Sequence, residues 1–329
     1  SVPHASGGGE TRYALLARGL VRIGARVTWL SMRQRDAAAT EYIDGVEHVH
    51  CGPRIAHPPT RSLGAKLRFM LSVVMHLLRH RYDIVDCQTY APLPAAWLTC
   101  RLRGMPLVAT IHDTSSASAG EVDQWLSAVD RTLARAAERV IYTLGYTRVL
   151  TVSHAVADDL VTRMGVPRGR VSVVPNAIDV ERIADVPAHE HKADLVFVGR
   201  LIPHKHPEAF LHAAAMVDAR RRAAGKVPLR LRIIGGGPLL ETTRALAGQL
   251  GLGAQMLHLG EVGAHDDVIA QIKASTVLVL PSTREGFGLV LAEAMACRTA
   301  VLAWSLPPVA ETLGPELIDA LIAPHNVQA

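Results

Sequence analysis

The sequence predicts an α/β protein made of two domains, each a doubly wound parallel sheet covered by helices. The chain has 329 residues, a length that suits two domains of roughly 150 residues each. Short runs rich in β-branched residues alternate with longer helical stretches, which is typical of a mainly parallel sheet. Most of these runs are unbroken rather than alternating, as expected for strands covered on both faces.

In the amino-terminal half, the strand-like runs are Arg26–Leu30, Ile84–Cys87, Leu107–Ile111, Val149–Val152 and Val171–Val174. The helical stretches between them are Thr11–Ile23, Lys66–Arg79, Val122–Ala137 and Ala155–Met164. The apolar residues of the segment 66–81 fall on one stripe, formed by Leu67, Met70, Leu71, Val74, Leu77 and Leu78. We expect this helix to be buried, with contact to a membrane surface as the less favoured alternative.

In the carboxy-terminal half, the strand-like runs are Leu195–Val198, Leu229–Ile234, Met256–Leu259, Val277–Leu280 and Ala300–Ala303. The helical stretches are Pro207–Ala219, Leu240–Leu250, Val268–Lys273 and Leu289–Ala296. One polar stretch, Asp179–Ala193, interrupts the alternation, so the predicted domains are residues 1–182 and 183–329. Because ligands of open parallel sheets bind beyond the carboxyl ends of the strands, we expect the site in a cleft between the two domains.

Composition excludes several classes of protein. The hydrophobic fraction of 49% excludes a disordered chain. No apolar run reaches the roughly 18 residues of a membrane span, so membrane contact is expected to be peripheral at most. The net charge is +5, but aromatic residues make up only 4%, too few for the stacking surfaces of a single-strand nucleic-acid binder. The four scattered cysteines suit reduced thiols, and we expect a cytoplasmic protein of undetermined oligomeric state.

Residues that could bind a metal ion do not form a recognisable set. His48, His50 and Cys51 lie close together, as do His189 and His191, but neither group has the spacing of a zinc site. A D-x-D pair, which many metal-dependent sugar transferases use, is also missing from the sequence. We therefore expect no metal and no other cofactor.

A strand–turn–helix segment near the end of the chain carries the strongest candidate site. A strand is expected to end at Leu280, a glycine-containing turn follows with Glu285, and a helix begins near Gly288. Free N–H groups at such a helix start attract phosphate, and Glu285 and Glu293 could each accept hydrogen bonds from paired hydroxyls. The alternative is a capping turn followed by an ordinary helix with a solvated glutamate.

A second candidate site follows the first strand of the carboxy-terminal half. The strand ends in Gly199, and Arg200 and Lys205 come next, five residues apart. A planar guanidinium and a compact ammonium group together suit a diphosphate, although two surface cations on a loop would look the same.

The amino-terminal half offers weaker candidates. Consecutive glycines, Gly7 to Gly9, form an expected loop before the helix Thr11–Ile23, and glycines let a backbone approach a ligand closely. His112 follows a predicted strand, where its side chain could point to a ligand or simply into the core. Since a first strand normally precedes such a loop, and no closing helix ends the sequence, we expect a processed or trimmed chain.

Taken together, these motifs resemble those of the retaining glycosyltransferases of family four, which have the two-Rossmann-domain GT-B architecture. The similarity covers nearly the whole chain. It rests on the E-x7-E motif from Glu285 to Glu293, Val198-Gly-Arg-Leu with Lys205, Val152-Ser-His154, Val174-Pro-Asn-Ala-Ile-Asp179 and Ile233-Ile-Gly-Gly-Gly-Pro238.

The resemblance implies a role for each matching residue. Arg200 and Lys205 would bind the donor diphosphate, Glu285 the transferred sugar, Glu293 the ribose, and His112 would lie beside the donor sugar. The catalytic set is then Arg200, Lys205, Glu285 and His112. The donor-binding set is Gly8, Gly9, Gly199, Gly286, Phe287, Gly288, Leu289, Val290 and Glu293.

The implied reaction is transfer of a sugar, with retention and without a metal, from a nucleotide-diphosphate sugar to a hydroxyl-bearing acceptor that the amino-terminal domain binds. The sequence departs from the family at Arg298, Ala300 and Ala177, where glycine, proline and glycine are common.

Two alternative functions stay open. One is a glycan phosphorylase or hydrolase that uses Glu285 and Glu293 as an acid/base pair. The other is a catalytically silent subunit that only binds sugar nucleotides.

Overall fold

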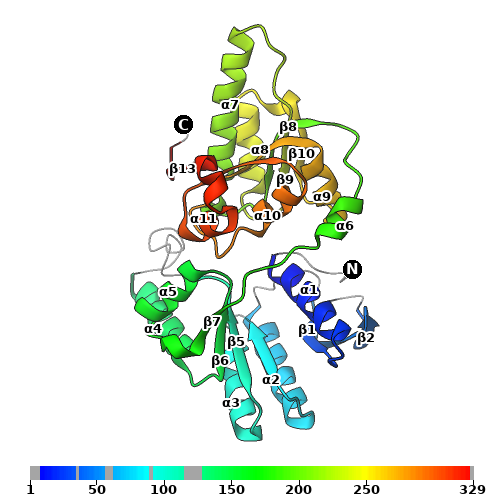
Figure 1. Ribbon diagram of the computed structural model, residues 1–329, viewed down its shortest axis with the longest axis vertical. Coiled ribbons are helices and arrows are strands. Elements are labelled where there is room, and N and C mark those ends of the chain that lie inside the picture. The colour runs from blue at the N-terminus through cyan, green and yellow to red at the C-terminus, as the bar shows by residue number, and fades with distance from the viewer. Residues whose placement is uncertain (1–7, 35–36, 56–61, 89–91, 115–127, 327–329) are drawn as a thin grey trace. The chain divides into compact units, whose positions relative to one another are not determined.

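The computed structural model describes residues 8–34, 37–55, 62–88, 92–114 and 128–326. Its chain folds into two compact units (Figure 1). The first unit comprises the described residues up to Thr114 and from Ala128 to Ala177, and the second begins at Ile178. Both units are built from parallel strands and helices, which confirms the predicted fold class.

The first unit contains two sheets. Its helices are α1 (Gly8–Arg22), α2 (Leu63–Arg79), α3 (Leu93–Arg103), α4 (Ala128–Thr143) and α5 (His154–Thr162). Strands β4 (Val85–Gln88), β5 (Leu107–Ile111), β6 (Arg148–Thr151) and β7 (Val171–Val173) form a parallel sheet in that order. Strands β1 (Thr28–Gln34), β3 (Val46–Ile55) and β2 (Thr40–Ile43) form the other sheet, in which β2 is antiparallel to β3.

Strands β2 and β3 were not predicted from the sequence. Strand β3 includes His48, His50, Pro53 and Arg54, so it lacks the unbroken apolar run that marked the other strands. His50 links β3 to both neighbouring strands, because its two ring nitrogens lie 2.6 Å from Glu41 Oε1 of β2 and 3.0 Å from Ser31 Oγ of β1. The predicted helix 122–137 lies partly outside the described residues, and the helix observed there, α4, continues to Thr143.

Helix α2 forms as predicted, but its predicted apolar stripe is buried only in part. Val73 and Leu77 are buried against the rest of the unit. Leu67 and Leu71, by contrast, are 55% and 61% exposed. The helix is apolar on more than one side, and β3 and α3 cover only part of that apolar surface.

The second unit has one six-stranded parallel sheet. Its strands are β8 (Ala193–Val198), β9 (Leu231–Ile234), β10 (Met256–Gly260), β11 (Ser275–Leu280), β12 (Ala300–Trp304) and β13 (Leu321–Ile322). Its helices are α6 (Val180–Asp185), α7 (Pro207–Ala223), α8 (Leu240–Gln249), α9 (His265–Lys273), α10 (Leu289–Ala296) and α11 (Pro307–Leu313). The order β10-β9-β8-β11-β12-β13 is that of a doubly wound fold, whose strand order reverses between β8 and β11.

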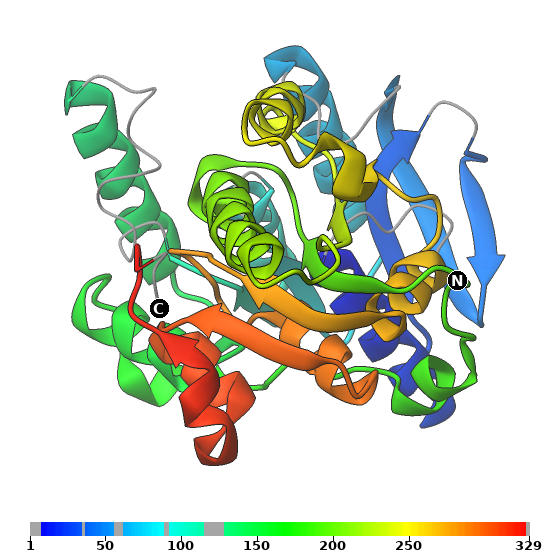
Figure 2. The same ribbon diagram turned by 90° about the horizontal axis from the view of Figure 1, so that it is seen from above.

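Helices cover both faces of this sheet (Figure 2). Helices α7 and α8 pack on one face, where Phe197, Phe210 and Leu231 are almost fully buried. Helices α9, α10 and α11 pack on the other face through Ile272, Leu291 and Val309. Burial on both faces explains why the strands of this unit have unbroken apolar sequences.

Candidate functional site

The strand order of the second unit brings two predicted segments together. Strands β8 and β11 are neighbours in the sheet although about 80 residues separate them in the sequence. The segment 199–205 follows β8 and the segment 281–288 follows β11, so both emerge from the carboxyl edge of the sheet. This is the point where the strand order reverses, which is the usual ligand position in such folds.

Lys205 and Glu285 form an ion pair at this edge. Lys205 Nζ lies 2.5 Å from Glu285 Oε1, and the side chains are only 19% and 10% exposed. Lys205 ends a short 3₁₀ turn, Pro203–Lys205, and the backbone N–H of Thr283 donates to the carbonyl of His204 at 2.9 Å. The loops after β8 and β11 are therefore joined by both backbone and side chains.

His206 ties the same two loops together and was missed by the sequence analysis. Its backbone has φ 47°, an uncommon conformation for a residue with a side chain. Its Nδ1 lies 2.6 Å from Glu208 Oε1 and its Nε2 lies 3.2 Å from Thr283 Oγ1. The imidazole thus bridges the start of α7 and the loop after β11.

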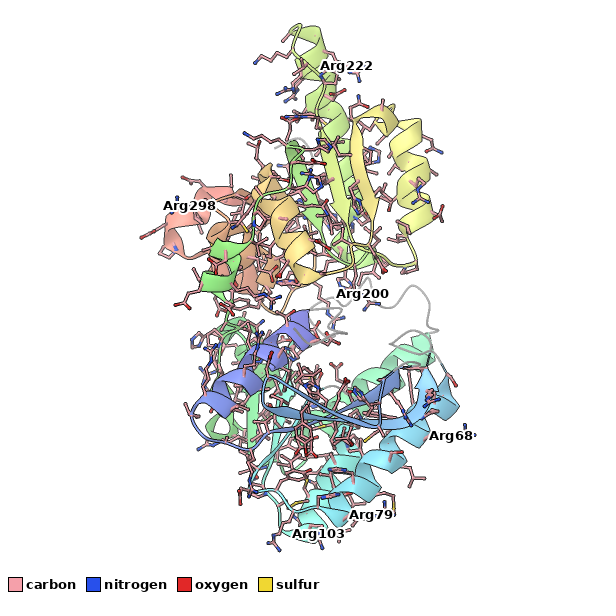
Figure 3. The ribbon with its side chains drawn as sticks, turned by 90° about the vertical axis from the view of Figure 1, so that its right-hand side faces the viewer. Arg68, Arg79, Arg103, Arg200, Arg222 and Arg298 are labelled. Carbon is pink, nitrogen blue, oxygen red and sulfur yellow. The ribbon has the colours of Figure 1, made fainter. Side chains whose placement is uncertain are left out.

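Arg200 occupies the first position after Gly199 and is exposed (Figure 3). It forms no ion pair with any residue that the structure describes, so its guanidinium is available to an anion. The loop is supported by the glycines after β9. Gly235 and Gly237 have φ of 143° and 148°, and a Cβ atom on either would collide with the carbonyl oxygen of Gly199 or Leu201.

The turn before α10 takes the predicted form. Gly288 caps the helix with φ 86°, and the helix covers Leu289–Ala296. The carbonyl of Phe287 accepts a 2.5 Å hydrogen bond from Thr312 Oγ1 of α11, which holds the turn in place. The N–H groups of Leu289 and Val290, the first two residues of the helix, have no intrahelical acceptor and are suited to an anion, whereas that of Leu291 donates to the carbonyl of Gly288.

Glu293 lies within α10 and is only 6% exposed. Burial raises the pKa of its carboxyl group to about 8, so the group is mostly protonated at neutral pH. Its Oε1 atom lies 3.3 Å from Nε2 of His265, the first residue of α9. A neutral carboxyl group both donates and accepts hydrogen bonds, which suits a pair of vicinal hydroxyls.

In the first unit, Gly9 and His112 come together. His112 follows β5, and its Nε2 lies 3.0 Å from Oε1 of Gln88, the last residue of β4. A Cβ atom on Gly9 would lie 3.6 Å from Gln88 Oε1 and 4.0 Å from His112 Nε2. Burial and the nearby Arg12 cation lower the pKa of His112 to about 4, so the imidazole is neutral at physiological pH.

The predicted glycine loop is only partly correct. Gly8 and Gly9 form the first turn of α1, which begins at Gly8 rather than at Thr11, and Gly7 lies outside the described residues. The helix is fixed by Arg12, which is 5% exposed. Its Nη1 donates to the carbonyls of Val174 and Pro175 and to Asn176 Oδ1 at 3.0–3.2 Å.

Comparison with known families assigns both parts of the chain. Residues 6–182 match the model of Glycosyltransferase Family 4, and residues 179–329 match that of Glycosyl transferases group 1. The chain belongs to glycosyltransferase family 4. It is thus a glycosyltransferase, and its structural neighbours have the GT-B fold.

Several curated relatives resemble this glycosyltransferase along most of its length. An uncharacterised glycosyltransferase of Methanocaldococcus jannaschii is 26% identical, over 94% of this chain and 80% of the relative. The D-inositol 3-phosphate glycosyltransferase of Gordonia bronchialis is 27% identical, over 97% of this chain and 72% of its own. The 2-deoxystreptamine N-acetyl-D-glucosaminyltransferase of Streptomyces fradiae is 30% identical, over 73% of this chain and 58% of its own.

Solved structures share the fold at lower sequence identity. Sucrose-phosphate synthase from Thermosynechococcus elongatus has a TM-score of 0.77 at 20% identity, covering 99% of this chain and 83% of that one. The Anabaena protein HepE, solved in complex with UDP and glucose, has a TM-score of 0.70 at 19% identity, covering 99% and 85%.

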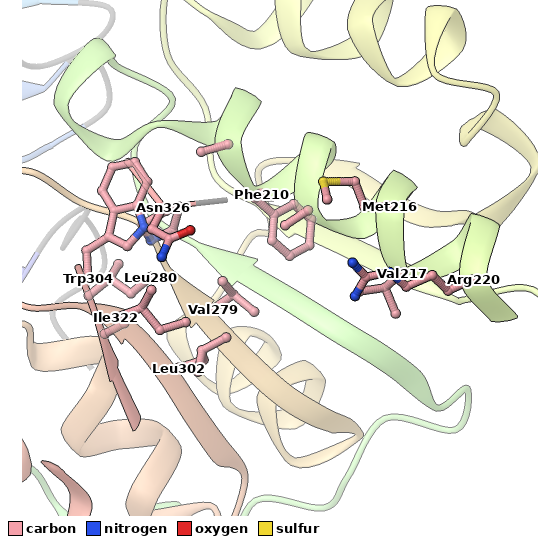
Figure 4. A pocket seen from close by; sticks show the side chains of 14 residues that line it. Phe210, Met216, Val217, Arg220, Val279, Leu280, Leu302, Trp304, Ile322 and Asn326 are labelled. Carbon is pink, nitrogen blue, oxygen red and sulfur yellow. The ribbon is translucent and has the colours of Figure 1, made fainter. Parts of the chain in front are cut away.

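The glycosyltransferase also has an apolar cavity of about 160 Å³ in its second unit (Figure 4). Phe210 and Met216 of α7 line one side, and Leu280, Leu302 and Trp304 line the other. None of the predicted donor-site residues lines this cavity. Among the described residues, no cluster of three or more His, Cys, Asp or Glu side chains could hold a metal ion.

Proposed function

We propose that this glycosyltransferase moves a sugar from a nucleotide-diphosphate sugar to a hydroxyl group of an acceptor, with retention and without a metal ion. The observation that carries the proposal is the Lys205–Glu285 ion pair beside the turn that opens α10. A similar fold binds UDP and glucose in HepE, which supports a sugar nucleotide as the donor.

The donor diphosphate is bound by cations and backbone amides. Lys205 has three N–H donors, and the ion pair engages one of them, which leaves two for phosphate oxygens. Arg200 adds a second positive charge from the same loop, and the first turn of α10 adds N–H groups. Together the Arg200 guanidinium, the free N–H donors of Lys205 and the helix-start amides bind the diphosphate oxygens, a task that would otherwise need a divalent cation.

The carboxyl groups recognise the two sugars. Glu285 keeps one oxygen for a hydroxyl of the transferred sugar while the other is paired with Lys205. Glu293, neutral and buried, binds the hydroxyls of the ribose. Because the Lys205 ammonium neutralises Glu285, we assign this carboxylate to binding rather than to nucleophilic attack.

The reaction breaks the bond between the anomeric carbon and the donor phosphate. The acceptor oxygen bonds to the same face of the anomeric carbon, and its proton passes to an oxygen of the departing diphosphate. Negative charge grows on that diphosphate in the transition state, so groups already directed at it stabilise the transition state more than the ground state. His112, uncharged at neutral pH, serves as a hydrogen-bonding partner of the sugar rather than as a cation.

The test begins with calorimetric titration of UDP, GDP, ADP and TDP in EDTA-containing buffer. The corresponding sugar nucleotides are then incubated with hydroxyl-bearing acceptors, and the anomeric configuration of the product is read by NMR. We expect one nucleotide to bind and its sugar to be transferred with retention. An inverted product would overturn the assigned stereochemistry.

Other outcomes would favour a different function. Release of sugar 1-phosphate from a glycan and phosphate would indicate a phosphorylase, and nucleotide-independent hydrolysis would indicate a hydrolase. Tight nucleotide binding without turnover on any acceptor would indicate a silent binding subunit.

A further inference from the structure

Helix α2 of the first unit carries an apolar stripe that the described residues leave exposed. The stripe consists of Leu63, Leu67, Leu71, Met75 and Leu78, which we call the leucine face. The spacings of four, four, four and three residues place these side chains on one side of a helix. They are 70%, 55%, 61%, 39% and 41% exposed.

The core side of α2 is a different stripe. Val73 and Leu77 are only 6% and 2% exposed, and the backbone of Phe69 packs against Gly52 of β3. At 100° per residue, Val73 and Leu77 point away from Leu71 and Met75. Helix α2 packs on the core of the unit through Val73 and Leu77. Packing within the unit therefore does not explain why the leucine face is apolar.

The neighbouring helix α3 also carries exposed leucines. Helices α2 and α3 pack against each other (Figure 1). Leu98 and Leu102 of α3, one helical turn apart, are 53% and 75% exposed. A stripe of exposed apolar side chains such as the leucine face marks a site of contact with another molecule or a membrane.

The charged residues of helix α2 itself are all basic. The segment from Leu63 to Tyr82 contains Lys66, Arg68, Arg79 and Arg81 and no acidic residue. These four cations form no ion pair with the described residues. Arg68 and Arg79 project outward from α2, and Arg103 lies at the end of α3 (Figure 3).

We propose that the leucine face docks on an anionic lipid surface, with α2 lying along the interface. The apolar side chains enter the acyl boundary while the flanking cations contact anionic headgroups. A second copy of the chain is a poorer occupant, because a symmetric contact would bring the unpaired cations of both copies together. None of the described helices is long and apolar enough to cross a bilayer, so α2 would lie on the membrane.

The experiment is sedimentation of the whole protein with vesicles of phosphatidylcholine alone or with 30% phosphatidylglycerol added. We expect binding to the anionic vesicles that weakens as salt is raised from about 0.05 to 0.5 M. Leu67→Ser with Leu71→Ser should reduce binding at least tenfold. Arg68→Glu with Arg79→Glu should reduce it about 25-fold or more, since each cation near such a surface contributes about fivefold.

Matched controls come from the second unit. Leu257→Ser removes another exposed leucine, and Arg244→Glu reverses another exposed arginine. Both should leave vesicle binding unchanged, and circular dichroism should show all variants folded. Absence of binding to anionic vesicles, or equal binding by the leucine-face variants and the wild type, would overturn the proposal. So would a dimer in analytical ultracentrifugation that Leu67→Ser with Leu71→Ser converts to a monomer.

Discussion

The ammonium group of Lys205 and the carboxylate of Glu285 hold each other at the carboxyl edge of the second sheet. Neither side chain is more than one-fifth exposed, so the pair is a pre-formed feature rather than a loose surface contact. Pre-formed charge is effective in catalysis because it needs no rearrangement as the transition state develops. Substitution of these two residues therefore tests the proposed donor chemistry most directly.

Lys205→Ala should reduce kcat/KM by about 10²–10³-fold, because one of the groups that stabilise the departing diphosphate is lost. Steady-state kinetics with the matched sugar nucleotide measures this effect. Lys226→Ala, which removes an exposed lysine of the same unit, should keep the wild-type rate. A Lys205→Ala enzyme as fast as the wild type would remove this residue from the proposed clamp.

Glu293→Gln should change how stability depends on pH. Burial raises the pKa of Glu293 from 4.5 to about 8 in the folded protein. Between these two pH values the carboxyl group is therefore protonated in the folded state and ionised in the unfolded state. This contribution to stability is complete below about pH 4.5 and is lost as pH rises towards 8. Glutamine does not titrate, so the variant does not lose stability in this way as pH rises. Its free energy of unfolding relative to that of the wild type should therefore increase by up to about 4 kcal/mol between pH 5 and 9.

Urea unfolding of the two proteins at several pH values measures this difference. A constant difference across the range would show that Glu293 titrates normally. Glu241→Gln in α8 is the matched control, because it removes a carboxyl group whose side chain is 78% exposed rather than buried.

At the scale of elements, the loops after β8 and β9 pack backbone against backbone. The N–H of Gly199 donates to the carbonyl of Ile234 at 3.0 Å, and the N–H of Leu201 donates to that of Gly236 at 2.8 Å. The glycine run after β9 therefore shapes the loop that carries Arg200 and Lys205. In the sequence this run stood out only as one of the motifs that resemble the family, and the structure shows its part in the packing.

Gly235→Ala should weaken nucleotide binding and destabilise the protein by more than about 1 kcal/mol. The new Cβ would collide with the carbonyl of Gly199, and φ 143° is unfavourable for alanine. Gly248→Ala in α8 is the control, since nothing lies within 4 Å of its Cβ position. This control should be stabilised by about 0.5–1 kcal/mol, and calorimetry of both variants compares the two effects. An unchanged Gly235→Ala protein would show that the two loops do not depend on this close approach.

Element boundaries were predicted best where the local signal was strongest. The helix predicted over Leu289–Ala296 matches α10, because a glycine with positive φ marks its start and an apolar sequence its length. Strands β2 and β3 were not predicted because polar residues interrupt the apolar pattern that identified the other strands. The exposure of α2 was also missed, since a hydrophobic period does not reveal which side faces the core.

For the whole molecule, the proposal of metal-free transfer predicts a response to chelation. EDTA should leave turnover within about twofold of its value in untreated enzyme, because side chains and amides carry the charge of the diphosphate. The nucleotide that binds should raise the free energy of unfolding by about 2.7 kcal/mol at 100 times its Kd, with or without EDTA. Loss of activity in EDTA that Mg²⁺ restores would contradict the metal-free mechanism.

The sequence by itself determined the α/β class, the alternation of strands and helices, and the order of the family motifs. These properties depend on local periodicity and spacing, which the chain carries in any conformation. The tertiary structure decided that β11 lies beside β8, which brings Lys205 to Glu285 across 80 positions of sequence. It also decided that Glu293 is buried and that the leucine face is not, because burial depends on which elements pack together rather than on the residues of one element.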